Sequence, residues 1–259
     1  MATVDLSQLT AVVQTFAPPK SLDRLVRSVR KQYPQLRVLA ADDCQQPVRH
    51  KDRDYFRLPA NTSRGAGRNA LLARVRTPYF LLLDDQSEFH RDTQIEPLLQ
   101  LVAEDKLDLA AGSFIACRRE FWVFTRRQPQ PNHGTLEFAG DRLTLEQGHR
   151  TAGDGYFWCD LVGDFFVART DKVRALGGWD PELMQGEREE FFVRAHHHGL
   201  RVGIRPDITL WQWNELPQQD VQECRQLHPK ALAVAKMGLA QMMDFDGQVI
   251  KAARHAQAA

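Results

Sequence analysis

The sequence predicts an α/β protein with a mostly parallel, Rossmann-like sheet flanked by helices, a small hairpin insertion and a helical C-terminal tail. In the first half, short apolar runs alternate with segments whose apolar residues recur at helical spacing. Two of these runs end in acidic pairs, Asp42-Asp43 and Asp84-Asp85. The composition of the 259 residues is that of a globular protein, with 34 Lys and Arg against 33 Asp and Glu and 43% hydrophobic residues.

The first half contains three expected strands and two expected helices. Strands are predicted over 9–15, 36–41 and 79–83, the last of which is almost wholly apolar and therefore reads as a central strand buried on both faces. A helix begins near Ser21, and another follows the glycine-containing turn at 61–69. Because strands that alternate with helices form parallel sheets, ligands are expected beyond the carboxyl ends of the strands, where both acidic pairs lie.

The second half is less regular. A further helix and a strand at 107–115 are followed by a hairpin around Gly140-Asp141. The remaining expected elements are a strand at 165–168, a short helix from Asp171, a helix at 189–198, and two short strands around Val202 and over 208–211. We expect one α/β domain at 1–216 and a helical extension at 217–259 that packs on this domain, since no linker separates the two.

Composition excludes several classes of protein. No apolar stretch approaches the roughly 18 to 20 residues of a membrane span, and the amino terminus lacks a leader pattern, so the chain is expected to be cytoplasmic. The net charge of +1 argues against a nucleic-acid partner. The four cysteines show no C-x-x-C spacing, which argues against a zinc ribbon or a disulfide framework.

The two acidic pairs are the most informative feature. One Asp after a strand is commonly a helix cap or a turn residue, but two pairs at one sheet edge point to a ligand. In an enzyme that uses a nucleotide sugar, Asp42-Asp43 would hydrogen-bond the base or ribose. Asp84-Asp85 would face the diphosphate, usually through a divalent cation.

Two further motifs have both structural and functional interpretations. The run Gly65-Ala66-Gly67-Arg68-Asn69 is either a glycine-eased helix start or a site where Arg68 and backbone amides approach a phosphate, and we weigh the two equally. Trp211 and Trp213 lie on one side of a strand, where core packing is commoner than stacking on a sugar.

Glu187, Glu189 and Glu190 open a predicted helix directly after the loop that contains Trp179 and Asp180. Acidic residues in a first turn stabilise the helix dipole, but three in four positions exceed what capping needs. Crowded carboxylates raise one another's pKa, which suits a general base. His196, His197 and His198 point in different directions on a helix and cannot converge on one metal ion.

These motifs, in this order, resemble those of inverting GT-A glycosyltransferases of the family-two type. The segment from Cys159 to Gly203, with GDFFVART, GGWDPEL and GEREEFF, is particularly similar to the branch of ganglioside-type β1,4-N-acetylgalactosaminyltransferases. The resemblance covers about residues 9–214. It implies a GT-A fold, a nucleotide-diphosphate-sugar donor, in particular a UDP-sugar such as a UDP-N-acetylhexosamine, and transfer to a hydroxyl acceptor with inversion.

The resemblance also implies roles for individual residues. Donor-binding positions are Thr15, Asp42, Asp43, Arg68, Asp84 and Asp85. Glu187 and Glu190 match acidic positions near the acceptor, with Glu190 favoured as the base, and Trp179 and Asp180 lie in the loop expected to hold the acceptor.

Two departures affect the metal. Asp85 matches the acidic motif that binds manganese or magnesium, but Gln86 and Gln212 replace the third carboxylate and a late histidine, and neutral amides are poor substitutes. Arg188 also stands where many relatives have the base Asp. A divalent cation is therefore a doubtful cofactor, and a non-catalytic nucleotide-sugar or glycan-binding domain is the alternative reading. A nucleotidyltransferase would need a basic loop after the first strand, which the sequence lacks.

Overall fold

The structure is a computed structural model that describes residues 5–15, 19–43, 54–120, 124–213 and 230–253. Its centre is a ten-stranded sheet with the strand order β10-β12-β6-β11-β4-β1-β2-β3, in which β5 also pairs with β12 and β7 with β6. The strands of this sheet are β1 (Leu9–Thr15), β2 (Arg37–Asp42), β3 (Tyr55–Arg57), β4 (Tyr79–Asp84), β5 (Ser87–Glu88), β6 (Leu109–Glu120), β7 (Phe124–Gln130), β10 (Phe157–Trp158), β11 (Phe165–Arg169) and β12 (Val202–Trp213).

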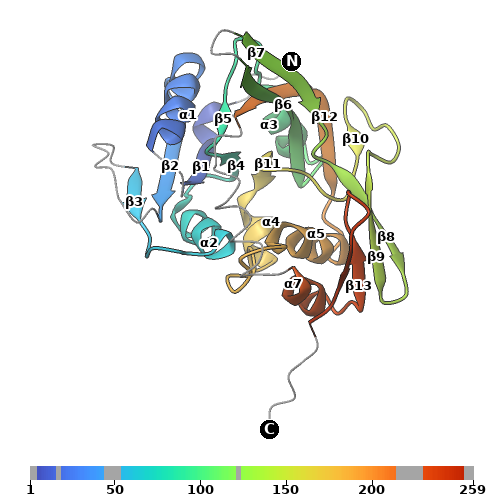
Figure 1. The fold of residues 1–259 in the computed structure, drawn as a ribbon. Coiled ribbons are helices and arrows are strands. Elements are labelled where there is room, and N and C mark those ends of the chain that lie inside the picture. Colours follow the sequence, from blue (N-terminus) through green and yellow to red (C-terminus); the bar gives the residue numbers. More distant parts are fainter. Residues whose placement is uncertain (1–4, 16–18, 44–53, 121–123, 214–229, 254–259) are drawn as a thin grey trace.

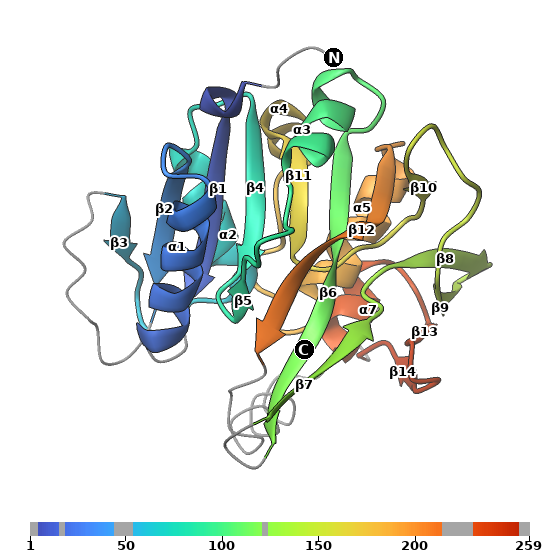
Figure 2. The same ribbon diagram turned by 90° about the horizontal axis from the view of Figure 1, so that it is seen from above.

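Helices cover both faces of the sheet, which gives three layers (Figures 1 and 2). One face carries two helices, α1 (Pro19–Gln32) and α3 (Glu96–Ala103). The other face carries α2 (Arg64–Arg74), α4 (Thr170–Ala175) and α5 (Glu187–His197). A short 3-10 turn, η1 (Leu6–Gln8), precedes β1.

The two hydrophobic cores follow from the alternation of side chains along each strand. Val12 and Leu82 belong to the core beneath α2 and α5, whereas their neighbours Val13 and Leu83 belong to the core beneath α1 and α3. All four side chains are at most 3% exposed. A strand buried on both faces must be apolar at successive positions, which explains the continuous apolar run of β4.

The sheet is parallel where β1, β2, β3 and β4 pair, and antiparallel where β11 enters it. In the parallel part Thr15 pairs with Asp42, and Gln14 pairs with Asp84. β11 runs antiparallel to β4 with Phe165 opposite Leu83, so the beginning of β11 lies at the edge where β4 ends. Because of this reversal, Asp164, the residue before β11, lies at the edge where β1, β2 and β4 end.

A second sheet contains the predicted hairpin. Its strands are β8 (Gly134–Ala139), β9 (Arg142–Gln147), β13 (Gln241–Met243) and β14 (Val249–Lys251), in the order β14-β13-β9-β8. Gly140 occupies the turn with a φ of 62°, a conformation that glycine adopts without steric cost. β13 pairs in parallel with β9, so the C-terminal segment is attached to the hairpin.

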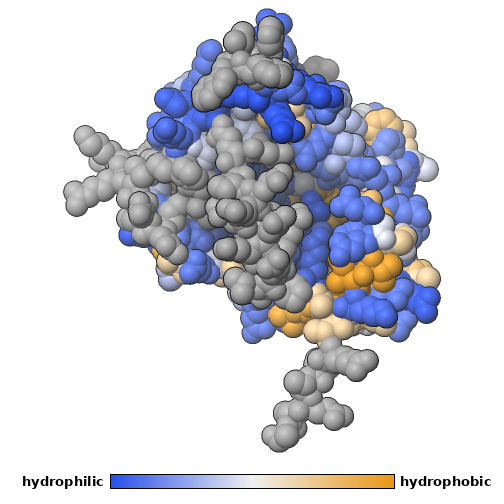
Figure 3. Space-filling model, in the orientation of Figure 1, coloured by the Kyte–Doolittle hydropathy of each residue, from blue (hydrophilic) through white to orange (hydrophobic). Residues whose placement is uncertain are grey.

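The prediction for the C-terminal segment is correct only in part. Residues 217–229 lie outside the described residues, and the helix α7 (Ala231–Lys236) follows them. Strands β13 and β14 replace the helix expected beyond it, because pairing with β9 satisfies their backbone and buries Met242. Figure 3 shows apolar residues of this face gathered near β13 and α7, and Leu232 and Met243 are exposed large hydrophobic residues.

Other differences concern strand ends. The two short strands expected near Val202 and over 208–211 are one strand, β12, whose register with β6 shifts between Ile204 and Thr209. The edge strands β3 and β7 were not expected, since their sequences are short or polar. Of the helices in the described ranges, none is long and apolar enough to cross a membrane.

Candidate functional site

The carboxyl ends of β1, β2 and β4 bring the two acidic pairs to one edge of the sheet. Thr15, Asp42 and Asp84 are the last residues of these three strands. The Thr15 hydroxyl donates to Asp85 Oδ2 at 2.6 Å, and the Asp43 amide donates to the Thr15 carbonyl at 3.2 Å. Thr15 therefore links the first acidic pair to the second.

The two members of the first pair have different surroundings. Asp42 accepts a hydrogen bond from the hydroxyl of Tyr55, which is fixed on β3. Asp43 is 7% exposed, and its Oδ1 has no hydrogen-bond partner among the described residues. Burial, together with the charges of Asp42 and Asp85, raises the pKa of Asp43 to about 6. A buried acceptor without a donor is costly, so this atom is suited to bind an N–H group of a ligand.

The second pair is already hydrogen-bonded inside the protein. Asp84 Oδ1 accepts from the Gln86 amide at 2.8 Å, and Asp85 Oδ1 accepts from Gln86 Nε2 at 3.3 Å. Burial and the charge of Asp85 raise the pKa of Asp84 to about 6, against the opposing effect of Arg64. Gln86 is thus a donor to both carboxylates and is oriented as a substitute for, rather than a ligand of, a cation.

Helix α2 brings two arginines to this edge. Ser63 caps the helix by accepting from the Ala66 amide at 3.1 Å. Gly65 lies where an added Cβ would come within 2.1 Å of the Asp180 carbonyl, so the helix start needs glycine for close contact with the loop before α5. Arg64 and Arg68 are one helical turn apart and both approach Asp164, at 4.0 and 2.5 Å.

The side chain of Arg68 is only 6% exposed, and its Nη1 has no hydrogen-bond partner in the described part of the chain. This atom lies 3.8 Å from Glu187 Oε1. Although burial disfavours a charged guanidinium, Glu187, Asp84 and Asp164 raise the pKa of Arg64. The functional interpretation of the GAGRN run and the structural one are therefore both supported, because the glycines permit the packing and the arginines line the edge.

Asp164 and Arg64 are site residues that the sequence reasoning missed. Both line a small cleft with Gln14, Arg68, Asp84 and Asp85. The signal for Asp164 was its place directly before β11, which matters only once that strand is known to be antiparallel. The signal for Arg64 was its spacing of four residues from Arg68 on a helix.

The three glutamates at the start of α5 are all buried, but they point to different partners. Glu187 faces Arg68. Glu189 contacts Arg188 at 3.1 Å and Lys230 at 3.4 Å. Although burial opposes ionisation, these two cations lower the pKa of Glu189 to about 2, which makes it a poor base.

Glu190, which the sequence favours as the base, is engaged in an ion pair on its own helix. Both of its oxygens bind Arg194, one of them at 2.8 Å from Nη2. Arg194 also donates to the carbonyls of Leu176 and Gly178, at 2.7 and 2.8 Å. Glu187 approaches Arg68, whereas Glu190 is bound by Arg194 and through it holds the loop after α4.

Trp179, which lies in the loop expected to hold the acceptor, packs inside the protein. Its ring is 3% exposed and stacks on Phe191 at 4.8 Å between centroids, so no face is open to a sugar. Its backbone is fixed by two hydrogen bonds with the Asn69 amide group, at 2.7 and 2.9 Å. Asp180 binds Lys236 at 2.7 Å and caps the turn at Glu182, which gives it a structural partner on α7.

The donor set at Asp84 and Asp85 does not fit a resident metal ion. Among the described residues, no group of three or more His, Cys, Asp or Glu side chains is placed to hold one. Gln212 pairs with Ser87 on β5, beside Gln86, so both expected ligand positions carry amides. Asp85 has both oxygens bound within the protein, and two arginines supply positive charge nearby.

The arrangement can therefore bind an anion between cationic and acidic groups. Arg64 and Arg68 supply donors for phosphate oxygens, and guanidinium groups bind such oxygens with two parallel hydrogen bonds. Asp43 supplies an acceptor at the neighbouring strand end. Glu187 supplies a carboxylate beside the arginines that could receive a proton.

Comparisons with known proteins agree with this geometry. Residues 10–173 match the family model described as glycosyl transferase family 2. The chain is 31% identical to mouse β1,4 N-acetylgalactosaminyltransferase 2 over 217 residues, which are 82% of this chain and 40% of that protein. It is 32% identical to rat β1,4 N-acetylgalactosaminyltransferase 1 over 209 residues, which are 78% of this chain and 38% of the relative. The chain thus spans well under half the length of these relatives.

Solved structures show the same fold. GalNAc-T7 in complex with UDP, GalNAc and Mn²⁺ aligns with a TM-score of 0.65 at 15% identity, over 80% of this chain and 44% of that chain. TarS from S. aureus (residues 1–349) in complex with UDP-GlcNAc aligns with a TM-score of 0.56 at 15% identity, over 87% of this chain and 66% of that chain. At this identity the likeness concerns the fold alone, which is that of GT-A glycosyltransferases. Because the family model covers more than half of the chain, this protein belongs to glycosyl transferase family 2.

Proposed function

We propose that this protein is a glycosyltransferase that moves a sugar from a UDP-sugar, in particular a UDP-N-acetylhexosamine, to a hydroxyl acceptor with inversion. One observation carries the proposal. Asp43 Oδ1 and Arg68 Nη1 are among the buried polar atoms that have no hydrogen-bond partner in the described residues, and they would supply a nucleotide diphosphate with an acceptor and a donor. The names of the relatives and the ligands of the structural neighbours support this choice of donor.

The nucleotide is held at the ends of β1 and β2. Asp43 accepts the ring N–H of the uracil base, which satisfies its unpartnered oxygen. Asp42, which accepts a hydrogen bond from Tyr55, lies beside Asp43 at the same end of β2. Thr15 contributes through Asp85, whose carboxylate it orients at 2.6 Å.

The diphosphate is stabilised by arginines in place of a metal ion. Arg68 Nη1 is free to donate to a phosphate oxygen, and Arg64 lies one turn earlier on the same helix. Negative charge develops on the leaving diphosphate as the glycosidic bond breaks, and donors that are already oriented stabilise such charge without reorganisation. Asp164 positions Arg68 through its 2.5 Å hydrogen bond.

Glu187 is the base in this proposal. It accepts the proton of the acceptor hydroxyl while the acceptor oxygen bonds to the anomeric carbon and the bond to the diphosphate oxygen breaks. Glu187 is preferred among the three clustered glutamates because Glu189 is bound by Arg188 and Lys230 and Glu190 by Arg194. Glu187 approaches Arg68 at the longer distance of 3.8 Å. One displacement of this kind inverts the anomeric configuration.

The alternative function is a non-catalytic domain that binds a nucleotide sugar. Gln86 is the observation that favours it, because its side-chain amide donates to Asp85 where the acidic motif of the resembling family has a third carboxylate. The alternative predicts nucleotide binding without turnover.

We also propose that residues 1–216 form the transferase domain and residues 217–259 an extension of it.

The test is a donor screen with UDP-, GDP- and dTDP-sugars, assayed for binding and hydrolysis with and without manganese. The proposal expects UDP-sugar binding, and slow donor hydrolysis that does not depend on manganese and is lost in Glu187→Gln. Binding without any turnover in the wild type would support the non-catalytic alternative. Equal, weak binding of all three nucleotides would contradict the UDP assignment.

A further inference from the structure

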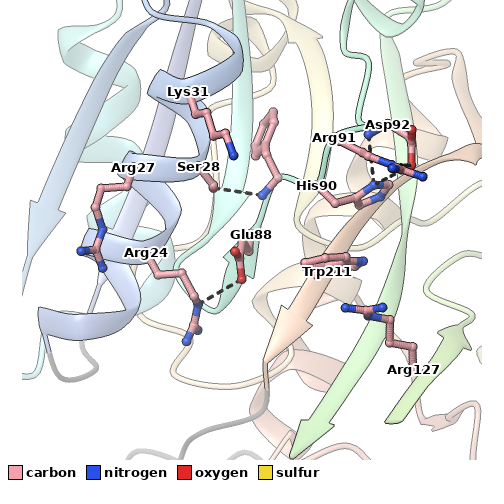
Figure 4. A pocket seen from close by; sticks show the side chains of 11 residues that line it. Arg24, Arg27, Ser28, Lys31, Glu88, His90, Arg91, Asp92, Arg127 and Trp211 are labelled. Atoms are coloured by element: carbon pink, nitrogen blue, oxygen red, sulfur yellow. Dashed lines mark hydrogen bonds and ion pairs between the residues drawn. The ribbon is translucent and has the colours of Figure 1, made fainter. Parts of the chain in front are cut away.

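An open hollow of about 750 Å³ lies on the α1 face of the sheet, between α1 and β12 (Figure 4). Helix α1 forms one wall with Arg24 and Lys31, and β12 and β7 form the other with Trp211 and Arg127. Its size is within the range of small-ligand sites. None of Asp43, Arg68, Asp84 and Glu187 lines it, so the hollow is distinct from the proposed donor site.

The lining of the hollow carries an excess of positive charge. Five cationic side chains and two carboxylates give it a net charge of +3 when histidine is neutral. The two carboxylates are already engaged: Glu88 accepts from Trp213 Nε1 at 2.7 Å, and Asp92 lies 3.4 Å from Arg91. Neither Lys31 nor Arg127 has a carboxylate partner within the described ranges of the chain.

Arg127 is held in position by an aromatic stack rather than by an ion pair. Its guanidinium lies 4.2 Å from the centre of the Trp211 ring, and His90 stacks on the other side of that ring with centroids 5.4 Å apart and an interplanar angle of 23° (Figure 4). Thr209 fixes His90 at 2.9 Å. Cation–π contact orients a guanidinium while leaving its N–H donors available.

Lys31 reaches into the same space from α1. Figure 4 shows its ammonium group pointing from the helix toward the wall formed by β12. Lys31 is exposed, so its charge costs little to maintain, but two cations facing one hollow repel each other unless an anion lies between them. Burial lowers the pKa of His90, so this ring adds no third charge near neutral pH.

We propose that this hollow binds an oxyanion ligand, with Lys31 and Arg127 donating to its phosphate or carboxylate groups from opposite walls. The same chemistry is offered by a free phosphorylated small molecule and by an acidic group carried on a sugar. Arg24 adds a third positive charge at the α1 wall. The site begins at Glu88, two residues after Gln86, so its ligand lies next to the proposed donor edge without using it.

The experiment measures binding of two probes, inorganic pyrophosphate and digalacturonic acid, to the full chain by calorimetry at low salt. The variants are Lys31→Gln and Arg127→Gln, and the matched controls are Arg30→Gln and Arg126→Gln, the preceding residues on the same helix and strand. We expect at least one probe to bind, and each variant to weaken it about tenfold while the controls change it less than about twofold. Pyrophosphate alone would identify a phosphorylated ligand, and digalacturonate an acidic sugar.

Three outcomes would overturn the proposal: no binding of either probe, equal weakening in controls and variants, or loss of binding in Arg68→Gln but not in Lys31→Gln and Arg127→Gln. The last result would mean that the probe occupies the donor site. UDP binding, measured in parallel, is expected to be the same in wild type and in the hollow variants. Failure of UDP binding in the wild type would count against the proposed function and leave the hollow to be judged by its own probes.

Discussion

Arg68 donates to Asp164 at 2.5 Å and thereby joins helix α2 to the residue that precedes β11. The two residues are 96 positions apart, and the contact exists because β11 runs against β4. A buried cation is stable only with a partner, so Asp164 permits Arg68 to lie 6% exposed with one nitrogen still free of hydrogen bonds.

Glu187→Gln is expected to lower kcat by about 10² to 10⁴-fold, because glutamine cannot receive the acceptor proton. UDP affinity should change less than about threefold, since Arg64 and Arg68 remain. Initial-rate kinetics and calorimetry measure the two quantities. Glu182→Gln is the control, because that carboxylate is 74% exposed and, among the residues that the structure describes, pairs with Lys236 alone. A variant with wild-type kcat would remove Glu187 from the mechanism.

Glu190→Gln should reduce stability rather than catalysis. The change removes one partner of a largely buried pair and weakens the attachment of Arg194 to the loop at Leu176 and Gly178. We expect the free energy of unfolding to fall by about 2 to 3 kcal/mol in urea denaturation. The exposed Glu182→Gln should shift it by less than about 0.5 kcal/mol. Unchanged stability with a kcat reduced a hundredfold would restore Glu190 as the base.

Arg64→Gln should weaken UDP binding about tenfold by removing one positive charge from the diphosphate site. The side chain is 42% exposed, so the fold should tolerate the change. Arg76→Gln, an exposed arginine just beyond the same helix, is the matched control. If both variants bind UDP equally well, Arg64 is not a donor ligand.

Gln86→Asp is expected to create metal binding. A third carboxylate beside Asp84 and Asp85 supplies the oxygen ligands that manganese prefers, and it removes the amide that now donates to Asp85. Manganese titrations in the presence of UDP should give a dissociation constant at least about tenfold lower than for the wild type. Gln86→Asn keeps the amide and should show no gain. A tight site in the wild type would contradict the arginine-based mechanism.

Asp84→Asn tests the raised pKa by its pH dependence. The folded-state pKa of about 6 exceeds the unfolded value of about 3.9, so the folded state retains a proton that the unfolded state has lost between these values. The stability of the wild type relative to Asp84→Asn should therefore fall as the pH rises from about 4 to 6, by about 1 to 2 kcal/mol. Urea unfolding at pH 4.5 and 7.5 measures this difference. The exposed Asp171→Asn should show no such trend, and a flat difference for Asp84→Asn would contradict the assigned pKa.

Local patterns predicted much of the fold. The ends of β1, β2 and β4 were placed within about one residue, because apolar runs that give way to polar or acidic residues define the edge where the acidic pairs lie. The direction of β11 was not predictable in the same way, since pairing direction depends on partners distant in sequence. Without the direction of β11, the position of Asp164 at the site could not be predicted.

The site residues likewise divide into those whose positions follow from local sequence and those whose contacts depend on distant parts of the chain. Asp42, Asp43, Asp84, Asp85 and Arg68 were predicted and do lie together, because strand ends and one helix start determine their positions. The choice among the three glutamates stays a prediction, since it depends on which neighbour each carboxylate meets. Arg194 lies four residues after Glu190 on the same helix, a spacing that points to this pair, whereas Lys230 and Arg68 come from other parts of the chain and no spacing rule reveals them.

The pairing of β13 with β9 has a consequence for how the chain can be shortened. β13 occupies one edge of the β8–β9 hairpin, and it carries Met242, which is fully buried. A chain that ended before Ala231 would leave the backbone N–H and C=O groups of β9 open along that edge. Such an edge is a template for strands of other molecules, so the truncated protein should self-associate into β-rich aggregates even though its larger sheet is intact.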